Sequence, residues 1–333
     1  MTSLPASAPD APEWRLLLSS QARDRIAADI HGAVSGQRLR IVTFEQAIDD
    51  PGCDADLAFI TRDVTGRSTK HEVSDSLQAC YSVLRRASAL RWVHTHSAGL
   101  DRPIFGELAA RGVEVTSSSG ANAQNVAHSA VGGLLALARR FPKLFAAQRE
   151  HRWSSLIDAD QPRDLPGQTA VIVGWGPIGR SIAALLQVIG LTVRVVRRNS
   201  EPAGDAIATF DFDHFAQAID AADWVVLACP LTEITRGLLD AETLDRLPRG
   251  ACIVNVSRGE VIDEAALIER LRSGQLGGAF LDVFSHEPLD AASPLWDMPG
   301  VIVSPHSAGH GTGNAARVEQ IFIQRLRDWI ARS

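Results

Sequence analysis

Short apolar segments of strand character alternate with amphipathic helical patterns along almost the whole chain. The first series of predicted strands covers 15–19, 39–44, 57–60, 91–95 and 113–116. The second covers 169–173, 192–196, 224–228, 252–256, 279–283 and 301–304. Strands separated by helices pair in parallel through right-handed crossovers. The rhythm predicts an α/β chain with two Rossmann-like domains, each a doubly wound parallel sheet.

Helical patterns fill the gaps between these strands. They are predicted at 21–34, 74–86, 103–111, 122–140, 178–189, 241–244, 264–272 and 314–330. The pattern at 122–140 separates the two series, and Pro142 then interrupts it. A polar, turn-rich stretch at 154–167 is typical of a surface connection, and residues 1–13 of a loose lead-in. The first domain therefore ends near residue 119, and the second begins at 120.

Composition narrows the classes of function. A length of 333 residues suits two domains, and a net charge of −6 argues against a nucleic-acid partner. The four cysteines form no C-x-x-C pair, which is typical of a reduced, cytoplasmic protein. No segment reaches the ~18 apolar residues of a membrane span, and the start lacks the pattern of a signal peptide. No histidine pair has a convincing metal-ligand spacing, so we predict no metal.

A glycine-rich hexapeptide joins the strand at 169–173 to the helix that follows. Gly174, Gly176 and Gly179 have the spacing G-x-G-x-x-G. Glycines at these places allow a tight turn, close approach of a pyrophosphate and close helix–strand packing. The helix N-terminus then offers N–H groups to the anion. Because the motif lies between a strand and a helix, we predict that it binds a dinucleotide.

The end of the next strand predicts which dinucleotide. An acidic residue roughly 20 residues beyond the first glycine accepts hydrogen bonds from the ribose of NAD. Here the segment reads Arg197-Arg198-Asn199-Ser200, with no acid before Glu201. A guanidinium can bind the 2′-phosphate of NADP bidentately. We therefore predict NADP(H) as the preferred cofactor, with NAD(H) possible; the alternative is that both arginines form only a solvated strand end.

Three further strands each end in a polar group. Arg258 follows the strand at 252–256, Glu287 follows the strand at 279–283, and His306 follows the strand at 301–304. Ligands of open α/β sheets bind beyond the carboxyl ends of the strands. Reduction of a 2-keto acid needs a carboxylate anchor and a proton donor, which Arg258 and His306 can supply. Glu287 can hydrogen-bond the other ring nitrogen and favour the protonated imidazole.

Four segments in order carry a family resemblance: G-x-G-x-x-G at 174–179, N-x-x-R-G at 255–259, D-V-F-x-x-E-P at 282–288, and P-H at 305–306. Because it carries these four segments in order, the chain resembles the D-isomer-specific 2-hydroxyacid dehydrogenase family over essentially its whole length. Within that family it resembles the glyoxylate/hydroxypyruvate reductases. The resemblance implies NAD(P)-dependent reduction of small 2-keto acids to D-2-hydroxy acids. It also implies a homodimer formed largely through the cofactor domain.

The resemblance assigns residues to this chemistry. It makes Arg258, Glu287 and His306 the catalytic trio, with Arg258 also binding substrate. It places Asp282 against the nicotinamide carboxamide. The expected cofactor contacts also include Pro177, Ile178, Arg197, Arg198, Asn199, Cys229, Pro230, Thr235, Val256 and Gly309.

The resemblance also divides the chain. The last helix is expected to return to the first domain, so that residues 1–119 plus 308–333 form the substrate-binding domain and 120–307 the dinucleotide-binding domain. An active-site cleft is expected between them. In the first domain, the backbone N–H groups of Ser97, Ala98 and Gly99 are expected to bind the substrate carboxylate.

Two alternatives remain open. One is a dehydrogenase of the formate or phosphite type. The formate type resembles an arrangement of glutamine and histidine, whereas this chain has Glu287 with His306. The other is a non-enzymatic dinucleotide sensor of the same fold, which turnover of keto acids would distinguish. His128 replaces a usual glutamate, and its role and that of Trp296 stay unassigned.

Overall fold

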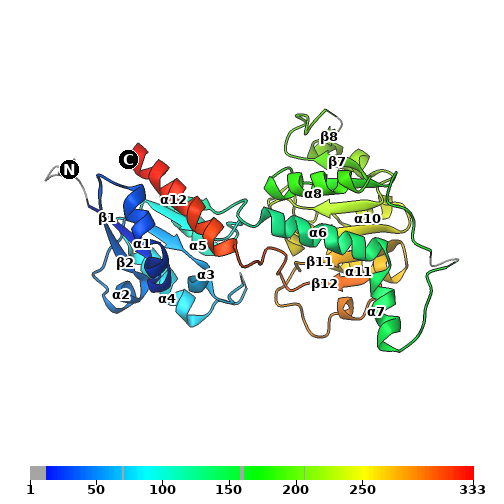
Figure 1. Ribbon diagram of the computed structural model, residues 1–333, viewed down its shortest axis with the longest axis horizontal. Helices are drawn as coiled ribbons and strands as arrows, with labels where there is room; N and C mark the ends of the chain where they lie inside the picture. The colour runs from blue at the N-terminus through cyan, green and yellow to red at the C-terminus, as the bar shows by residue number, and fades with distance from the viewer. Residues whose placement is uncertain (1–12, 70, 158–160, 206) are drawn as a thin grey trace, which may run out of the picture. The chain divides into compact units, whose positions relative to one another are not determined.

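The computed structural model describes residues 13–69, 71–157, 161–205 and 207–333. The chain divides into two compact units (Figure 1). Unit 1 comprises Met1–Ala121 and Thr312–Ser333, and unit 2 comprises Asn122–Gly311. The boundaries placed from the sequence lie a few residues earlier at both junctions. The predicted lead-in, apart from Glu13, lies outside the described residues, as do residues 158–160 of the predicted surface connection.

Unit 1 is built on a five-stranded parallel sheet in the order β2-β1-β3-β4-β5. The strands are β1 (Glu13–Leu18), β2 (Arg38–Thr43), β3 (Leu57–Ile60), β4 (Trp92–Thr95) and β5 (Glu114–Ser117). The helices are α1 (Ser20–Ala33), α2 (Phe44–Asp49), α3 (Arg62–Thr65), α4 (Asp75–Arg86), α5 (Pro103–Ala110) and α12 (Asn314–Arg332). Each face of the sheet carries its own core. Helices α1 and α12 cover the face of Leu16 and Leu18, and α2, α4 and α5 cover the face of Leu17.

Unit 2 is built on a seven-stranded parallel sheet in the order β12-β11-β10-β9-β6-β7-β8. The strands are β6 (Thr169–Val173), β7 (Thr192–Val196), β8 (Ala208–Phe210), β9 (Trp224–Leu227), β10 (Ala251–Asn255), β11 (Leu276–Leu281) and β12 (Val301–Val303). The helices are α6 (Ala123–Ala138), α7 (Phe141–Arg149), α8 (Pro177–Val188), α9 (Phe215–Ile219), α10 (Ala241–Arg246) and α11 (Glu264–Arg272). Helices α6 and α8 cover one face, and α9, α10 and α11 cover the other. The predicted fold class of two doubly wound parallel sheets is confirmed.

Several elements differ from the sequence prediction. Pro142 does not end the helical stretch but lies in the first turn of a new helix, α7. The break comes from Arg140, whose φ of 60° turns the chain between the two helices. The pattern also missed β8, α9, α2 and α3, which are short elements. Within the described part of the chain, no helix is both long and apolar enough to span a bilayer.

Candidate active site

The loop between β6 and α8 has the geometry that its glycines predict. Gly174 has a φ of 106°, and a Cβ there would lie 2.6 Å from the carbonyl oxygen of Ala228. A Cβ on Gly179 would overlap the carbonyl of Gly174. Both positions therefore require glycine, one for the turn and one for close helix–strand packing.

Gly176 differs from the other two glycines because a Cβ there would meet no atom within 4 Å. It is the N-cap of α8 and makes no side-chain cap, and Pro177 and Ile178 begin the helix. The first N–H groups of a helix have no partner within it. Open space at this helix start fits a dinucleotide pyrophosphate, which N–H donors and the helix dipole would hold there.

Arg197 lies just beyond the end of β7. Its backbone N–H donates to Phe210 O at 3.0 Å, and its side chain is 26% exposed. The guanidinium Nη2 lies 3.5 Å from Glu201 Oε2. Arg198 and Asn199 are exposed beside it. The two arginines are thus accessible at the strand end, and Glu201 pairs with the first of them.

The segment after β9 is held by its own hydroxyl groups. Thr235 Oγ1 donates to Pro230 O at 2.7 Å and accepts from Thr232 N at 2.8 Å. Cys229 is buried, and its burial raises the pKa of the thiol to about 12. The thiol therefore stays protonated near neutral pH, which excludes a nucleophilic role.

Arg258 is placed by Asn255, which the sequence analysis quoted in a motif but did not assign to the site. Asn255 Oδ1 accepts from Ser257 N at 3.0 Å and from Ser257 Oγ at 2.7 Å, and its Nδ2 donates to Arg258 O at 3.0 Å. Asn255 is 1% exposed. Val256, between them, is buried and donates to Leu227 O. Asn255 therefore shapes the turn that presents Arg258. Its place in the N-x-x-R-G motif is the sequence signal from which this role could have been predicted.

The turn of Arg258 packs directly on the segment that leads to Glu287. A Cβ on Gly259 would overlap the backbone of Phe284 and Ser285. Phe284 N donates to Glu287 Oε1 at 3.2 Å, which fixes the carboxylate. This close approach brings the arginine turn and the carboxylate segment together within unit 2.

Glu287 and His306 form a hydrogen-bonded contact at the ring nitrogen where the sequence predicts one. Glu287 Oε2 lies 2.8 Å from His306 Nδ1. The glutamate side chain is 11% exposed and the histidine side chain 50%. A carboxylate accepts hydrogen bonds only, so Nδ1 carries a proton and donates it. No described residue hydrogen-bonds His306 Nε2, which leaves that atom for a ligand.

The backbone of His306 is in the left-handed region, with a φ of 51°. A non-glycine residue there costs on the order of 1 kcal/mol and persists only where its surroundings hold it. His306 N donates to Asp282 O at 2.8 Å and to Ser304 O at 3.0 Å. The strained conformation and the pair with Glu287 together fix the direction of the imidazole.

The carboxylate of Asp282 accepts hydrogen bonds from residues on both sides of His306. Its Oδ1 accepts from Ser304 Oγ at 2.6 Å, from Ser307 N at 2.8 Å and from Ala308 N at 3.0 Å. The side chain is buried, and burial raises its pKa against the opposing effect of these hydrogen bonds. The carboxylate thus organises the His306 loop; its predicted contact with the nicotinamide stays a prediction. Gly309 is needed for packing, because a Cβ there would overlap the Asn122 amide.

The predicted substrate loop lies in unit 1, after β4. Ser97 Oγ donates to Gly99 O at 2.8 Å, and Ser97 N donates weakly to Thr95 Oγ1 at 3.4 Å. Among the described residues, none accepts a hydrogen bond from the N–H groups of Ala98 or Gly99. The role of these N–H groups in carboxylate binding stays a prediction.

His94, on β4 itself, is bonded on both sides. Its Nδ1 lies 2.8 Å from Thr116 Oγ1 and its Nε2 lies 2.9 Å from Ser118 Oγ. Ser118 Oγ donates its proton to Thr95 O, so it must accept from Nε2–H. Thr116 Oγ1 accepts from Trp92 Nε1 and can donate its own proton to Nδ1, which suits a neutral ring. The ring is fully buried, and burial lowers its pKa to about 3.

Two residues left unassigned by the sequence analysis are also placed in unit 2. His128 is exposed on α6. Trp296 is half exposed, and its Nε1 donates to Asp290 O at 2.9 Å. The described residues contain no group of three or more His, Cys, Asp or Glu side chains that could hold a metal ion.

Comparison with known proteins identifies similar chains. Residues 131–308 match the family described as D-isomer specific 2-hydroxyacid dehydrogenase, NAD binding domain. A glyoxylate reductase of Korarchaeum cryptofilum is 31% identical over 257 residues, which cover 73% of this chain and 74% of that protein. A D-3-phosphoglycerate dehydrogenase of Mycobacterium leprae is 34% identical over 67% of this chain, a match that spans only 42% of its own length. A solved structure from Xanthobacter autotrophicus Py2, a D-isomer specific 2-hydroxyacid dehydrogenase in complex with NADPH and MES, is 29% identical with a TM-score of 0.72 and covers 95% of this chain and 96% of that one.

Proposed function

The chain belongs to the D-isomer-specific 2-hydroxyacid dehydrogenase family, and on that premise we propose that it reduces small 2-keto acids to D-2-hydroxy acids with NADPH or NADH. Glyoxylate, hydroxypyruvate or a similar acid is the proposed substrate. The observation that carries the proposal is the 2.8 Å contact between Glu287 and His306, which leaves His306 Nε2 directed to a ligand. The roles of the individual residues below belong to the same proposal.

Residues of unit 2 would hold the cofactor. The pyrophosphate would lie at Gly176 and the start of α8, where the glycine leaves open space. Thr235 and Pro230 would line the nicotinamide ribose. When bound, the nicotinamide supplies or accepts the hydride.

Arg258 and His306 would act on the substrate. Arg258 would bind the substrate carboxylate or polarise the carbonyl through its guanidinium, which stays charged. His306 Nε2 would donate a proton to the carbonyl oxygen as it becomes a hydroxyl. Glu287, already bound to Nδ1, would stabilise the ring in the protonated form that donates. In the oxidative direction the same nitrogen takes the proton back.

We propose NADP(H) as the preferred cofactor because Arg197 and Arg198 are accessible at the end of β7. A 2′-phosphate would accept charge-assisted hydrogen bonds from these guanidinium groups. The pairing of Arg197 with Glu201 is long, at 3.5 Å, and exposed, so a phosphate can displace it. The solved relative from Xanthobacter autotrophicus was crystallised in complex with NADPH.

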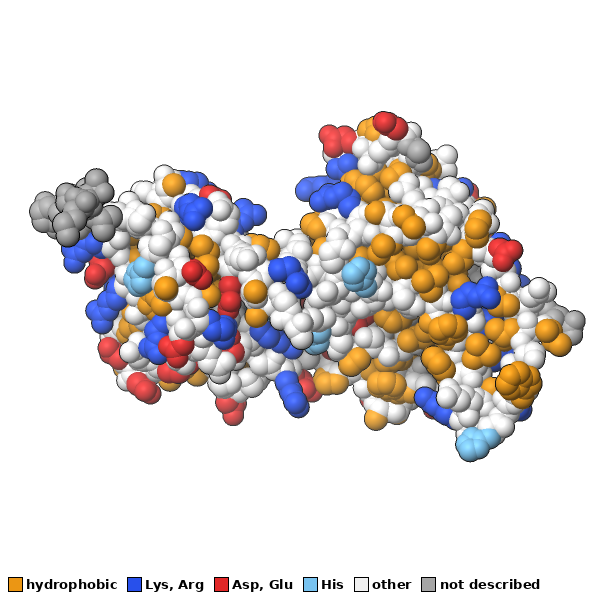
Figure 2. Space-filling model, in the orientation of Figure 1, with side chains coloured by type: hydrophobic (Ala, Val, Ile, Leu, Met, Phe, Trp, Pro, Cys, Tyr) orange, Lys and Arg blue, Asp and Glu red, His pale blue; other side chains and the backbone are white. Residues whose placement is uncertain are grey.

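A homodimer is proposed as well, on the surface of unit 2. Large apolar side chains are exposed on α7 and the segment after it: Phe141 at 43%, Phe145 at 52%, Ile157 at 64% and Trp153 at 96%. Figure 2 shows hydrophobic side chains gathered over α6, α7 and α8. Apolar patches of this kind mark association surfaces. Light scattering of the wild type and of Trp153→Ser tests this proposal, and we expect the variant to shift toward the monomer.

The cytoplasmic location predicted from the cysteines stays a prediction.

The proposal is tested by a panel of acids with both cofactors in parallel. Glyoxylate, hydroxypyruvate and pyruvate are offered with NADPH or NADH, and D-3-phosphoglycerate with NADP or NAD, while the reduced nicotinamide absorbance is followed. We expect turnover of at least one small keto acid, faster with NADPH. Measurable NADPH binding without turnover of any acid would overturn the enzymatic proposal and favour a dinucleotide sensor.

A further inference from the structure

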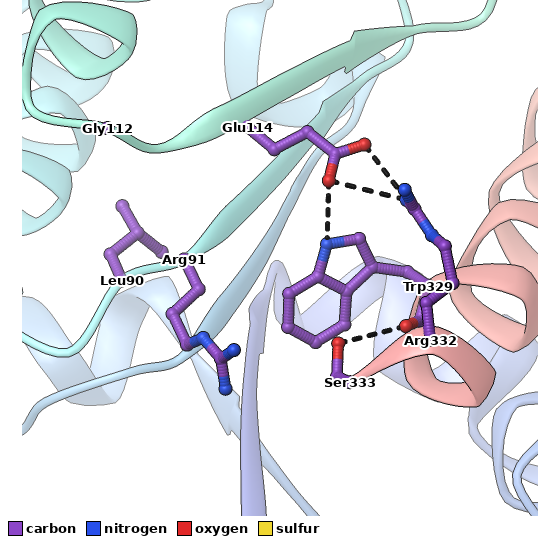
Figure 3. A pocket seen from close by; sticks show the side chains of 7 residues that line it. All are labelled: Leu90, Arg91, Gly112, Glu114, Trp329, Arg332 and Ser333. Carbon is purple, nitrogen blue, oxygen red and sulfur yellow. Dashed lines mark hydrogen bonds and ion pairs between the residues drawn. The ribbon is translucent and has the colours of Figure 1, made fainter.

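Unit 1 contains a pocket at the amino ends of β4 and β5, beside the end of α12 (Figure 3). Its volume is about 360 Å³, and its lining residues are Leu90, Arg91, Gly112, Glu114, Trp329, Arg332 and Ser333. This volume is within the range of small-molecule sites. The predicted substrate loop follows β4 at its other end, so the pocket is a separate place in the same unit.

On one side of the pocket, Glu114, Trp329 and Arg332 are joined by hydrogen bonds. Glu114 Oε2 accepts from Trp329 Nε1 at 3.0 Å, and Glu114 Oε1 accepts from Arg332 Nη2 at 3.0 Å. Ser333 Oγ donates to Trp329 O at 3.0 Å. Figure 3 shows this group on the side of α12, with Leu90 and Arg91 across the opening. The negative charge of Glu114 is therefore already compensated by Arg332.

The positive charge of Arg91, in contrast, is not paired with a carboxylate among the described residues. Its guanidinium lies 5.2 Å from the ring centre of Trp14 and 5.3 Å from that of Trp329. Within the described residues, the side chain makes no hydrogen bond or ion pair. An aromatic face attracts the cationic guanidinium. Because the two indole planes meet at 81°, the guanidinium can lie parallel to only one of them. The two indoles thus keep a charged, donor-rich group at the pocket.

We propose that this pocket binds a small organic anion through Arg91, which receives a carboxylate or phosphate group on its in-plane N–H donors. A guanidinium fork matches both groups bidentately, and its contacts with the two indoles reduce the entropy that ordering the side chain costs. Arg332 at the rim is already paired with Glu114, so Arg91 carries the uncompensated positive charge, and Leu90 offers an apolar wall to the rest of the ligand. The site takes no part in the proposed reduction and stands or falls independently of it.

The test is a titration of the full chain, labelled with ¹⁵N at its indoles, followed through the Nε1–H signals in NMR spectra. The probes are inorganic phosphate and succinate at constant ionic strength, with uncharged succinamide as the matched control. Trp329→Phe assigns the relevant signal. We expect a saturable shift of the Trp329 signal with both anions and none with succinamide.

Three variants locate the binding. Arg91→Gln should raise the dissociation constant at least tenfold. Arg40→Gln removes the same charge from an exposed position on β2, which two strands separate from β4, and should leave the constant within twofold. Glu114→Gln removes the negative charge and releases Arg332, so it should lower the constant severalfold, a gain that misfolding cannot produce.

Several results would overturn the proposal. They are the absence of saturable shifts, equal shifts with succinamide, an equal loss of affinity in Arg40→Gln, or weaker binding in Glu114→Gln. If Arg91→Gln fails to fold because its contacts with the indoles are lost, the Glu114→Gln result decides.

Discussion

The first crossover of unit 1, β1 to α1, and that of unit 2, β6 to α8, occupy equivalent places in their sheets. β1 lies between β2 and β3, and β6 lies between β7 and β9. In unit 1 the N-cap of α1 is Ser19, whose side chain accepts from Ala22 N at 3.1 Å. In unit 2 the N-cap of α8 is Gly176, which has no side chain and stands in open space. The same topology gives a helix N-terminus a side-chain cap in one unit and leaves it without one in the other.

The histidines of the two units repeat this contrast. His94 in unit 1 is buried, neutral and bonded at both ring nitrogens. His306 in unit 2 is half exposed and bonded at Nδ1 to a carboxylate. A polar side chain near a strand end therefore has a structural role when residues of its own unit hydrogen-bond all of its polar atoms. When one of those atoms has no hydrogen-bond partner in its unit, that atom is available to bind a ligand.

Replacing His306 should produce the largest effect. His306→Ala removes the proposed proton donor, and turnover should fall roughly 10²- to 10⁴-fold. The affinity for NADPH should stay unchanged, because the loop around Gly176 is untouched. Steady-state kinetics and fluorescence titration of NADPH measure the two quantities. An equal collapse of cofactor binding would leave the acid role of His306 without support.

Arg197→Asp should reverse the cofactor preference. Hydrogen bonds to charged groups contribute about 1.5–3 kcal/mol each, so the preference for NADPH over NADH should fall roughly 10- to 100-fold. The ratio of the two kcat/KM values measures it. Arg198→Asp, at the exposed neighbouring position, provides the comparison and should have the smaller effect. An unchanged ratio in Arg197→Asp would mean that this guanidinium does not meet the 2′-phosphate.

The stability of unit 1 should depend on His94 in acid. The unfolded histidine binds a proton near pH 6.5, but burial, assisted by nearby Arg325, holds the pKa of folded His94 at about 3. Its stabilising effect is therefore complete above pH 6.5 and is lost as the pH falls toward 3. Between pH 7.5 and pH 5 the loss is about 2 kcal/mol.

Urea unfolding at pH 7.5 and pH 5.0 measures this loss. His94→Gln keeps an amide in place of the ring but cannot titrate, so its free energy of unfolding should fall about 2 kcal/mol less than that of the wild type. Equal losses in both proteins would show that His94 does not remain neutral. Turnover at pH 7.5 should be the same in both if His94 is structural.

The two N-caps provide the finest comparison. Gly176→Ser gives unit 2 the kind of cap that unit 1 has, and it should weaken NADPH binding roughly tenfold while the protein still folds, because a Cβ meets open space. Ser19→Ala should cost about 1 kcal/mol of stability and leave NADPH binding unchanged. Fluorescence titration and urea unfolding of both variants measure the pair. Unchanged NADPH affinity in Gly176→Ser would place the pyrophosphate elsewhere.

The sequence predicts best the strands that are buried on both faces and bounded by turns. The bounds of β3, β6 and β7 and of the helix α11 match the prediction residue for residue. β3 and β6 are apolar runs bounded by polar residues or glycine, and in β7 only Arg194 interrupts the apolar pattern. The predicted site residues lie in the loops after such strands: the glycine loop begins directly after β6, and Arg258 comes three residues after β10.

Element bounds that depend on contacts distant in sequence are predicted less well. β11 begins at Leu276, three residues before the predicted start. Gly277 and Gly278 resemble a turn, yet glycine is required there because a Cβ would lie 2.6 Å from Gly300 O at Gly278 and would overlap Gly250 at Gly277. The loop-forming role of Asp282 also depends on its burial, which the motif alone does not reveal.

The helix α12 links the last residues of the chain to the core of the first unit. Phe322 stacks on Phe59 with ring centres 4.0 Å apart, and Trp329 contacts Trp14 at 5.3 Å. During synthesis, the ribosome therefore releases every residue of unit 2 before unit 1 receives its final helix. Unit 2 can fold as soon as it emerges, whereas one face of the unit 1 sheet waits uncovered. A premature stop near residue 312 would thus uncover one face of the unit 1 sheet and expose it to chaperones and proteases.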